Sequence, residues 1–333
     1  MVRGGDPFLQ PEPLTYTGRV AKKKKKNEEV LPEGMSRRQA KLARRAAERA
    51  AFERDPRPYD GFAAEADLVA MQEFVPSAHF LAETVADAAF PRPVRIVTVL
   101  PGAVAALVRP EEEGGEALVA LQTAQRGNNP NRDLAFALNW AKEAAPGASL
   151  ETGVADGSEP ALDTLLAKDQ TPLIEVAEDF NWWLTEDQQS NPTVQQTLQQ
   201  ANDSVLPSER IDAPVTGAAW WIDPGEKAHI RWIRPETENV LLPALARVHA
   251  AGELNLGEDT RFAGVFRTHG LLVPVFDLDN TVTAPEFAAP LEKLDARLAA
   301  ALDELAGSGD AAQLTAEEQK SKQTIIAREV TIR

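Results

Sequence analysis

The chain has 333 residues, 43% hydrophobic and 26% charged, which is enough to bury a sizeable core in one large domain or two smaller ones. It contains no cysteine, so disulfide bonds, thiolate catalysis, zinc–thiolate sites and iron–sulfur clusters are excluded. No N-terminal apolar signal region is present, and no apolar run approaches the length of a membrane span. We therefore expect a soluble cytoplasmic protein without membrane insertion.

The formal net charge of −16 is divided unevenly along the chain. Residues 1–58 carry 15 Lys and Arg against 8 Asp and Glu, a balance of +7, whereas residues 59–333 carry 20 against 43, a balance of −23. A basic arm attached to an acidic body is typical of proteins whose arm meets a polyanion. The acidic body alone would be repelled by nucleic acid.

The basic N-terminal region is predicted to have two parts. Residues 1–34 indicate a disordered tail, because its prolines break helices and it lacks apolar periodicity. Residues 35–58 indicate a basic helical arm, since Ser36 and Gln39 form a capping box and the following run is rich in Ala, Arg, Lys and Gln. The prolines from Pro56 onward end this helix.

The arm carries the strongest functional signal in the chain. Its basic residues recur at helical spacing along one face, and a flexible lysine cluster precedes them. A guanidinium stripe on a helix without a large apolar face suits a phosphate backbone and does not suit a bilayer. The alternatives are a solvated arm and an arm that docks on the protein's own acidic body. The candidate nucleic-acid-binding residues are Lys22, Lys23, Lys24, Lys25, Lys26, Arg37, Arg38, Lys41, Arg44, Arg45 and Arg49.

Residues 59–333 are predicted to form an acidic α+β globular body, in which antiparallel hairpins and a meander are covered by helices. Two subdomains, at about 59–150 and 170–333, are one possible division. Three short strands with two turns are expected within 93–123, and a helix is expected over 131–145. The region 147–214 is acidic and irregular, with a strand near 172–178.

The second half of the body is more regular. Hairpins are expected over 218–234, turning at Pro224-Gly225, and over 261–278, turning at His269-Gly270. Helices are expected over 237–253, over 289–307 and from Thr315 onward. The leucines of the second of these helices share one face, and we expect that face to pack over the second hairpin. They are Leu291, Leu294, Leu298 and Leu302.

The stretch "VFDLDNTVT" resembles the motif of haloacid-dehalogenase-type phosphatases, Asp-x-Asp-x-Thr after an apolar strand. The resemblance implies Asp277 as nucleophile and Asp279 as general acid/base. That family places its nucleophile early in a parallel sheet, whereas here only 56 residues follow Asp277 and Gly270 predicts an antiparallel hairpin. The alternative interpretation is a buried strand whose end opens a turn through the side chain of Asp279.

The other sequence patterns that could mark a catalytic, metal or phosphate site are weak. The four histidines, at 79, 229, 249 and 269, are isolated, so we expect hairpin or helix-surface residues and no metal site or cofactor. Adjacent tryptophans on a strand point to opposite faces, so one of Trp220 and Trp221 is expected in the core. No phosphate-binding glycine loop and no Gly-x-Ser-x-Gly elbow is present.

Two stretches, "PEGMSRRQAKLARRAAERAAFERDPRPYDGFAAEADLVAMQEFVPSA" and "RVHAAGELNLGEDTRFAGVFRTHGLLVPVFDL", carry a family resemblance together with "VLPGAVAALVR". They resemble an uncharacterised actinobacterial family described as a domain of unknown function. The resemblance implies a bacterial cytoplasmic protein and supplies no catalytic residues. The sequence favours a non-enzymatic protein whose basic arm contacts RNA, including ribosomal RNA, or another polyanion. The alternatives are an Asp277/Asp279 phosphatase and a protein–protein adaptor.

Overall fold

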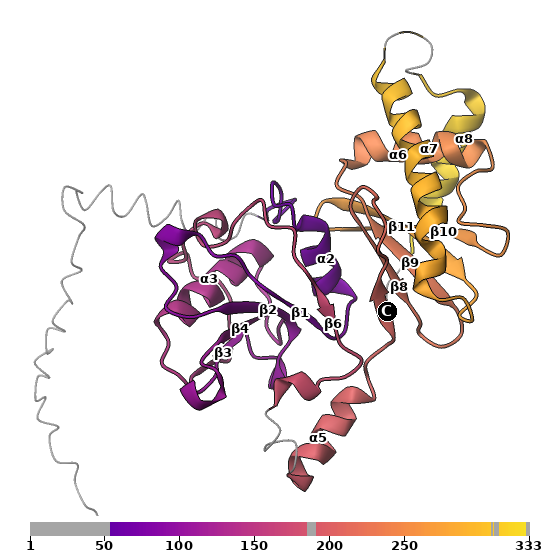
Figure 1. Cartoon of the computed structure of the whole chain (residues 1–333). Helices are drawn as coiled ribbons and strands as arrows, with labels where there is room; N and C mark the ends of the chain where they lie inside the picture. Colours follow the sequence, from indigo (N-terminus) through magenta and orange to yellow (C-terminus); the bar gives the residue numbers. More distant parts are fainter. Residues whose placement is uncertain (1–53, 185–190, 308, 310–312, 331–333) are drawn as a thin grey trace, which may run out of the picture. The chain divides into compact units, whose positions relative to one another are not determined.

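The computed structural model describes residues 54–184, 191–307, 309 and 313–330 (Figure 1). These residues form two β-sheets with helices packed against them, so the predicted α+β class is confirmed. None of the helices in the described ranges is both long and apolar enough to cross a membrane. Short 3-10 helices connect the larger elements: η1 (Ala86–Ala88), η2 (Pro101–Ala103), η3 (Glu111–Glu113), η4 (Leu162–Thr164), η5 (Asn181–Trp183) and η6 (Ala284–Phe287).

The first sheet, which we call the N-terminal sheet, has six strands in the order β5-β3-β4-β2-β1-β6. Its central strand β4 is apolar on both faces over residues 117–121, as expected for a strand that is covered on both sides. The strands are β1 (Ala78–Leu81), β2 (Val94–Val99), β3 (Ala106–Val108), β4 (Ala117–Gln122), β5 (Ser149–Leu150) and β6 (Glu175–Val176).

The predicted meander is wrong in one respect. The three expected strands within 93–123 are present as β2, β3 and β4, but β4 pairs with β2 in parallel, and β3 lies on the other side of β4. Every residue of 117–121 is buried, so β4 is stabilised most in a central position. Insertion of β4 between β3 and β2 provides that position, whereas a simple meander would leave it at an edge.

The second sheet, which we call the C-terminal sheet, is antiparallel throughout, with the order β10-β11-β9-β8-β7. Both predicted hairpins are confirmed, because β8 pairs with β9 and β10 pairs with β11. Trp220 is fully buried and Trp221 is half-buried on the opposite face, as expected from strand alternation. The strands are β7 (Ser208–Arg210), β8 (Ala218–Ile222), β9 (Ala228–Ile233), β10 (Arg261–Thr268) and β11 (Leu271–Leu278).

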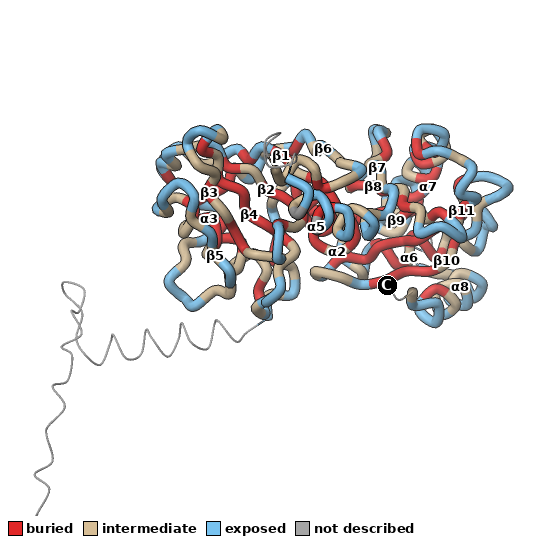
Figure 2. Tube along the Cα trace, turned by 90° about the horizontal axis from the view of Figure 1, so that it is seen from below, coloured by how far each residue is buried: buried red, intermediate tan, exposed pale blue. Residues whose placement is uncertain are grey.

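Helix α2 (Glu65–Glu73) was not predicted from the sequence, and it lies between the two sheets. Residues 65–72 are all buried, and Figure 2 shows this segment as part of the buried interior. Residues of α2 and of both sheets belong to one apolar cluster, which includes Met71, Ile96 and Trp220. The helix therefore contributes to the inner face of each sheet.

The outer face of the C-terminal sheet is covered by helices α6 (Glu238–Ala250), α7 (Ala288–Ala306) and α8 (Ala316–Ala327). Leu291, Leu294 and Leu298 are fully buried in the same cluster as Phe262 and Phe276 of the second hairpin, and Leu302 is partly buried against it. The predicted apolar face of the helix over 289–307 is therefore confirmed.

Helix α3 (Pro130–Glu143) confirms the helix predicted over 131–145, and it packs on β3 and β4. The region 147–214, predicted as largely irregular, also contains helix α5 (Pro192–Asn202). The Trp182-Trp183 pair lies in η5, where the Trp183 indole nitrogen donates to the Val99 carbonyl at 3.0 Å. These aromatic residues cover the face of the N-terminal sheet opposite α2.

Candidate functional site

A polar cavity of about 520 Å³ lies at the C-terminal end of α2. Most of its wall comes from residues 54–59, the end of α2, the segment from β4 through the following loop, the first turns of α3, and the turn between β10 and β11, and Ala105 and Gly153 complete it. We call it the Glu73 cavity. Its size is typical of small-molecule sites, which combine an apolar lining with a few convergent polar groups. The groups used below are Tyr59, Gln72, Glu73, Arg126, Asp133 and His269.

Residues 54–59, the leading segment of the described chain, are fixed to both halves of the body. The backbone nitrogen of Asp55 donates to the Asn129 side chain at 2.6 Å, and Asn131 donates to Asp55 at 3.1 Å. The Arg57 guanidinium donates to both carboxylate oxygens of Glu65, at 2.7 and 2.6 Å, and to the Pro235 carbonyl at 2.7 Å. Bidentate pairing of this kind fixes geometry as well as charge.

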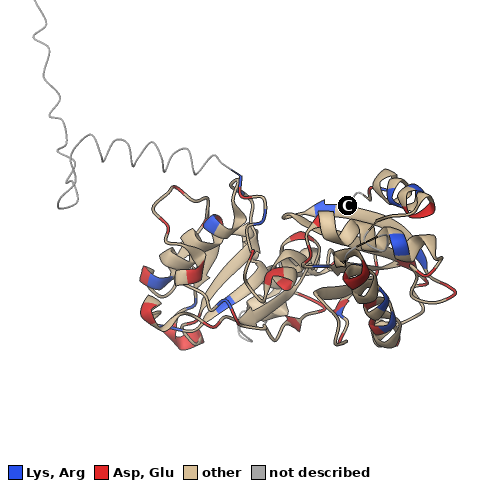
Figure 3. Cartoon of the chain, turned by 90° about the horizontal axis from the view of Figure 1, so that it is seen from above, with Lys and Arg blue, Asp and Glu red and all other residues tan. Residues whose placement is uncertain are grey.

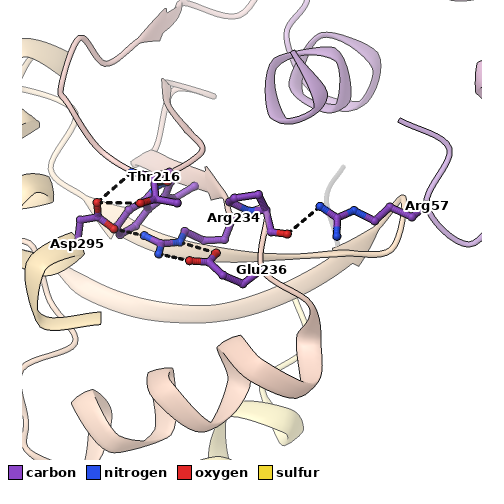
Figure 4. A network of polar contacts seen from close by, with 7 residues as sticks. Arg57, Thr216, Arg234, Glu236 and Asp295 are labelled. Atoms are coloured by element: carbon purple, nitrogen blue, oxygen red, sulfur yellow. Dashed lines mark hydrogen bonds and ion pairs between the residues drawn. The ribbon is translucent and has the colours of Figure 1, made fainter. Parts of the chain in front are cut away.

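A buried arginine next to Pro235 completes this anchor (Figure 4). The Arg234 side chain is only 1% exposed, donates to Glu236 at 3.0 Å and also pairs with Asp295 of α7. Its guanidinium lies 4.6 Å from the centre of the Trp232 ring. Because a buried cation is stable only when it is paired, this network holds the end of β9 in place and presents the Pro235 carbonyl to Arg57.

His269 forms one wall of the Glu73 cavity, at the tip of the β10–β11 turn. Its φ of +51° is left-handed, and its ring stacks on buried Tyr59 with the ring centres 5.9 Å apart. The adjacent Gly270 has a φ of +77°, and a Cβ there would lie 2.3 Å from the Pro56 carbonyl oxygen. His269 lies in the hairpin turn between β10 and β11, in line with the expectation of a hairpin histidine, and its side chain is 9% exposed.

The electrostatics of this wall follow from burial. Burial, with help from the positive charges of Arg126 and Arg54, lowers the pKa of His269 to about 4, so its ring is neutral at pH 7. Burial raises the pKa of the Glu73 carboxyl, and the Arg126 guanidinium opposes that rise. The Tyr59 hydroxyl donates to Gln72 at 2.9 Å, and burial raises its pKa as well.

The acids of this wall differ in how fully they are hydrogen-bonded. Asp133, in the first turn of α3, accepts from the backbone nitrogens of Gly127 and Ala155 at 2.6 and 2.9 Å. Glu73 instead lies 3.8 Å from Arg126 Nη1 and 3.9 Å from His269 Nδ1, both beyond hydrogen-bond range. Sequence reasoning missed both acids, although the predicted turn at His269-Gly270 marked one part of the wall.

The two aspartates of the phosphatase-like motif lie elsewhere, at the end of β11. Asp277 lies 3.2 Å from His229 Nδ1 and 3.3 Å from Arg261. Asp279 is fully exposed and accepts from the backbone nitrogen and hydroxyl of Thr281 at 2.9 and 2.8 Å. The predicted turn hydrogen bond of Asp279 is thus present. Strand β11 lies between β10 and β9 and is antiparallel to both.

The candidate nucleic-acid-binding residues of the arm, from Lys22 to Arg49, lie outside the described residues. The described chain begins at Arg54, so the last five residues of the predicted arm, 54–58, belong to the leading segment. Across the described ranges, no group of three or more His, Asp or Glu side chains is placed to hold a metal ion.

A helix enclosed between two sheets, with a polar cavity at its end, defines an α+β protein whose described body carries a candidate small-molecule site. Residues 58–333 match the family of unknown function DUF5926, and the chain belongs to that family. No curated protein and no solved structure matches the chain.

Proposed function

We propose that this chain is a non-enzymatic binding protein whose basic N-terminal arm contacts RNA, including ribosomal RNA. The observation that supports the proposal is the charge division, +7 over residues 1–58 and −23 over residues 59–333. An acidic body repels a polyanion, so attraction must come from the arm. The family resemblance adds the proposal that the protein acts in the cytoplasm of an actinobacterium.

The ion pairs of the body support assigning this role to the arm. Arg210 donates to buried Asp67 at 2.8 Å, and Arg267 donates to both carboxylate oxygens of Glu238 at 2.8 Å. Over the described chain, basic and acidic positions lie mixed (Figure 3). Arginines held by carboxylates contribute little net attraction for phosphate, whereas the arm has an excess of cations.

The test compares the full chain with a chain that lacks residues 1–53. A deletion to residue 58 would also remove Asp55 and Arg57, which anchor the body, and misfolding could then be mistaken for a direct effect on RNA binding. Binding of a single-stranded RNA is measured by fluorescence anisotropy over a series of salt concentrations. We expect binding by the full chain that weakens steeply with salt, because each phosphate contact releases counterions. We expect no binding by the shortened chain.

A matched pair of variants then locates the RNA-binding residues. Replacement of Arg38, Lys41, Arg45 and Arg49 by Gln should reduce the slope of log affinity against log salt by up to about 0.7 for each phosphate that is no longer bound. The control replaces four lysines of the body by Gln and should leave the slope unchanged. These are Lys142, Lys227, Lys293 and Lys320. Equal RNA binding by the shortened chain would contradict the proposal, and capture of an acidic protein in place of RNA would favour the adaptor.

No second function is proposed at the phosphatase-like motif. The oxygens of Asp277 face His229 and Arg261, and one oxygen of Asp279 accepts both hydrogen bonds from Thr281. A nucleophilic carboxylate and its acid/base partner need to face a shared substrate position. The contacts of these aspartates instead favour a role in holding the strand end and the turn.

A further inference from the structure

We propose that the Glu73 cavity binds an α-amino acid or a similarly small zwitterion, with its ammonium group on Glu73 and its carboxylate on Arg126. Both side chains line the cavity, one at the end of α2 and the other in the loop between β4 and α3, and their charged groups lie 3.8 Å apart. The inference does not rest on the arm, because the two residues that carry it, Glu73 and Arg126, belong to the body.

Glu73 is the acid of this wall that has acceptor capacity to spare. No described residue donates a hydrogen bond to it, the Arg126 guanidinium lies 3.8 Å away, and the neutral His269 ring lies 3.9 Å away. The carboxylate oxygens of Asp133 and Asp55, by contrast, each accept one hydrogen bond from the protein. A half-buried carboxylate without a close hydrogen-bond donor destabilises the folded protein, and a ligand ammonium group would supply that donor.

Arg126 is the matching cation. Arg267, another arginine of the wall, is held by both oxygens of Glu238, so it has little capacity for a ligand. Arg126 meets Glu73 only at 3.8 Å, and its side chain is 49% exposed. A half-exposed side chain on a loop can move at low cost, so Arg126 can open away from Glu73 and accept a carboxylate by bidentate hydrogen bonds.

The separation of these two charges explains why a zwitterion fits better than a simple amine. A direct Arg–Glu pair would close to about 2.7–2.9 Å. At 3.8 Å the pair is not closed, and both charged groups border the cavity. A ligand that places an ammonium and a carboxylate between them replaces one long contact with two short ones. A lone amine would leave Arg126 unmatched, and a lone carboxylate would leave Glu73 unmatched.

The remaining wall accommodates a side chain. Leu121, Leu134 and Ala137 give the cavity an apolar surface, and the stacked rings of Tyr59 and His269 form a flat one beside it. Neutral His269 adds no charge that would compete with Arg126 for the carboxylate. A volume of about 520 Å³ accommodates an amino acid with ordered water. We therefore expect amino acids with apolar or aromatic side chains to bind best.

The experiment is a binding screen on the full chain. The twenty amino acids are tested by thermal shift, and the best one is measured by isothermal titration calorimetry. The same amino acid is then tested with its amine acetylated, with its carboxylate converted to an amide, and as the simple amine. We expect at least a tenfold loss of affinity for each of these derivatives. The absence of any shift across the panel, or equal binding of the derivatives, would overturn the proposal.

Variants separate this site from adventitious binding. Glu73→Gln and Arg126→Gln keep the shape of each side chain, and we expect each to weaken binding at least tenfold. The control is the Glu253–Arg297 pair, a loose exposed contact at 3.5 Å that does not line the cavity. Glu253→Gln and Arg297→Gln should leave affinity unchanged. If Glu73→Gln did not fold, Arg126→Gln would test the site alone. Unchanged binding in Arg126→Gln would overturn it.

Discussion

Helices α2 and α7 bury their side chains in different ways. Helix α7 has the ordinary amphipathic pattern, with leucines on the face that packs in the core and charged residues on the other. Helix α2 is buried on every side, including its acidic residues Glu65 and Asp67. The comparison shows that a helix can be central to the core without any apolar stripe, provided that its polar groups are matched from elsewhere.

The partners of α2 come from other segments, some near in sequence and some distant. Asp67 pairs with Arg210, which is 143 residues away, and Gln72 accepts from the Tyr59 hydroxyl. Burial raises the pKa of the Asp67 carboxyl, and the Arg210 guanidinium opposes that rise. Most charged residues of α7 instead reach solvent, where pairing is worth little, and Asp295, which pairs with buried Arg234, is an exception. Four measurements test this difference between the two helices.

The largest effect is expected from a charge on α2. Ala70 is fully buried between the sheets, so Ala70→Asp would place an unpaired carboxylate there and should cost about 3–5 kcal/mol of unfolding free energy. The control Ala300→Asp, on the exposed face of α7, should cost less than about 0.5 kcal/mol. Urea unfolding measures both. Equal effects in the two helices would remove the distinction between them.

A slightly smaller effect is expected on the buried face of α7. Leu298 is fully buried, and Leu298→Ala should cost about 2–5 kcal/mol, the range for a leucine truncated in a packed core. Arg297→Ala, one position away and half-exposed, should cost about 0.5 kcal/mol or less. An unchanged unfolding midpoint in Leu298→Ala would indicate that the leucine face is a partner-binding surface, which would favour the adaptor.

A pH effect of about 1–3 kcal/mol is expected at the cavity where α2 ends. Because burial lowers the pKa of His269 from 6.5 to about 4, the unfolded chain binds this proton first as the pH falls. Stability should therefore be lost between about pH 6.5 and pH 4, and His269→Asn, which tolerates a left-handed backbone, should lose less over that window.

Other charged groups line the cavity with His269 and also affect how stability depends on pH, so the wild type must be compared with His269→Asn. Glu73, Arg126 and Arg54 all line the same cavity. The raised pKa of Glu73 acts in the opposite direction, because its folded form holds a proton at a higher pH than the unfolded chain does. The difference between the two pH–stability curves isolates the histidine. Parallel curves for the wild type and His269→Asn would show that His269 titrates normally.

The smallest effect is expected in the turn that precedes α7. Asp279 is fully exposed, so Asp279→Ala should leave the unfolding midpoint unchanged, although its hydrogen bonds to Thr281 are removed. We also expect no magnesium-dependent hydrolysis of a phosphomonoester by the wild type. Hydrolysis that disappears in Asp277→Asn would support the phosphatase alternative and turn this site into the catalytic one.

Local patterns predicted α7 and the two hairpins because each depends on neighbours in sequence. The leucines of α7 recur every three or four residues, and Pro224-Gly225 and His269-Gly270 provide turns. Helix α2 has no such pattern, since apolar and polar residues are mixed around it and residues 65–72 are all buried. The parallel pairing of β2 and β4 depends on where β3 lies, which strand composition does not determine.

The cavity could not be predicted for the same reason. Its wall joins residues near 54, 72, 126 and 269, and none of these segments carries a motif alone. His269 looks like an ordinary turn residue in the sequence, and only the approach of Gly270 to Pro56 places it against Tyr59. The arm differs from the cavity in this respect, because the helical spacing and the charge of its basic residues are evident from the sequence.

The position of α2 also constrains how the chain can fold during synthesis. Asp67 can pair with Arg210 only after the ribosome has made 143 further residues, a delay of roughly 10–30 s at ordinary elongation rates. Throughout that interval the inner face of the N-terminal sheet lacks the strands that complete its core. The nascent chain therefore exposes a helix whose Asp67 still lacks its partner, and this exposure defines a period in which chaperone binding or aggregation competes with folding.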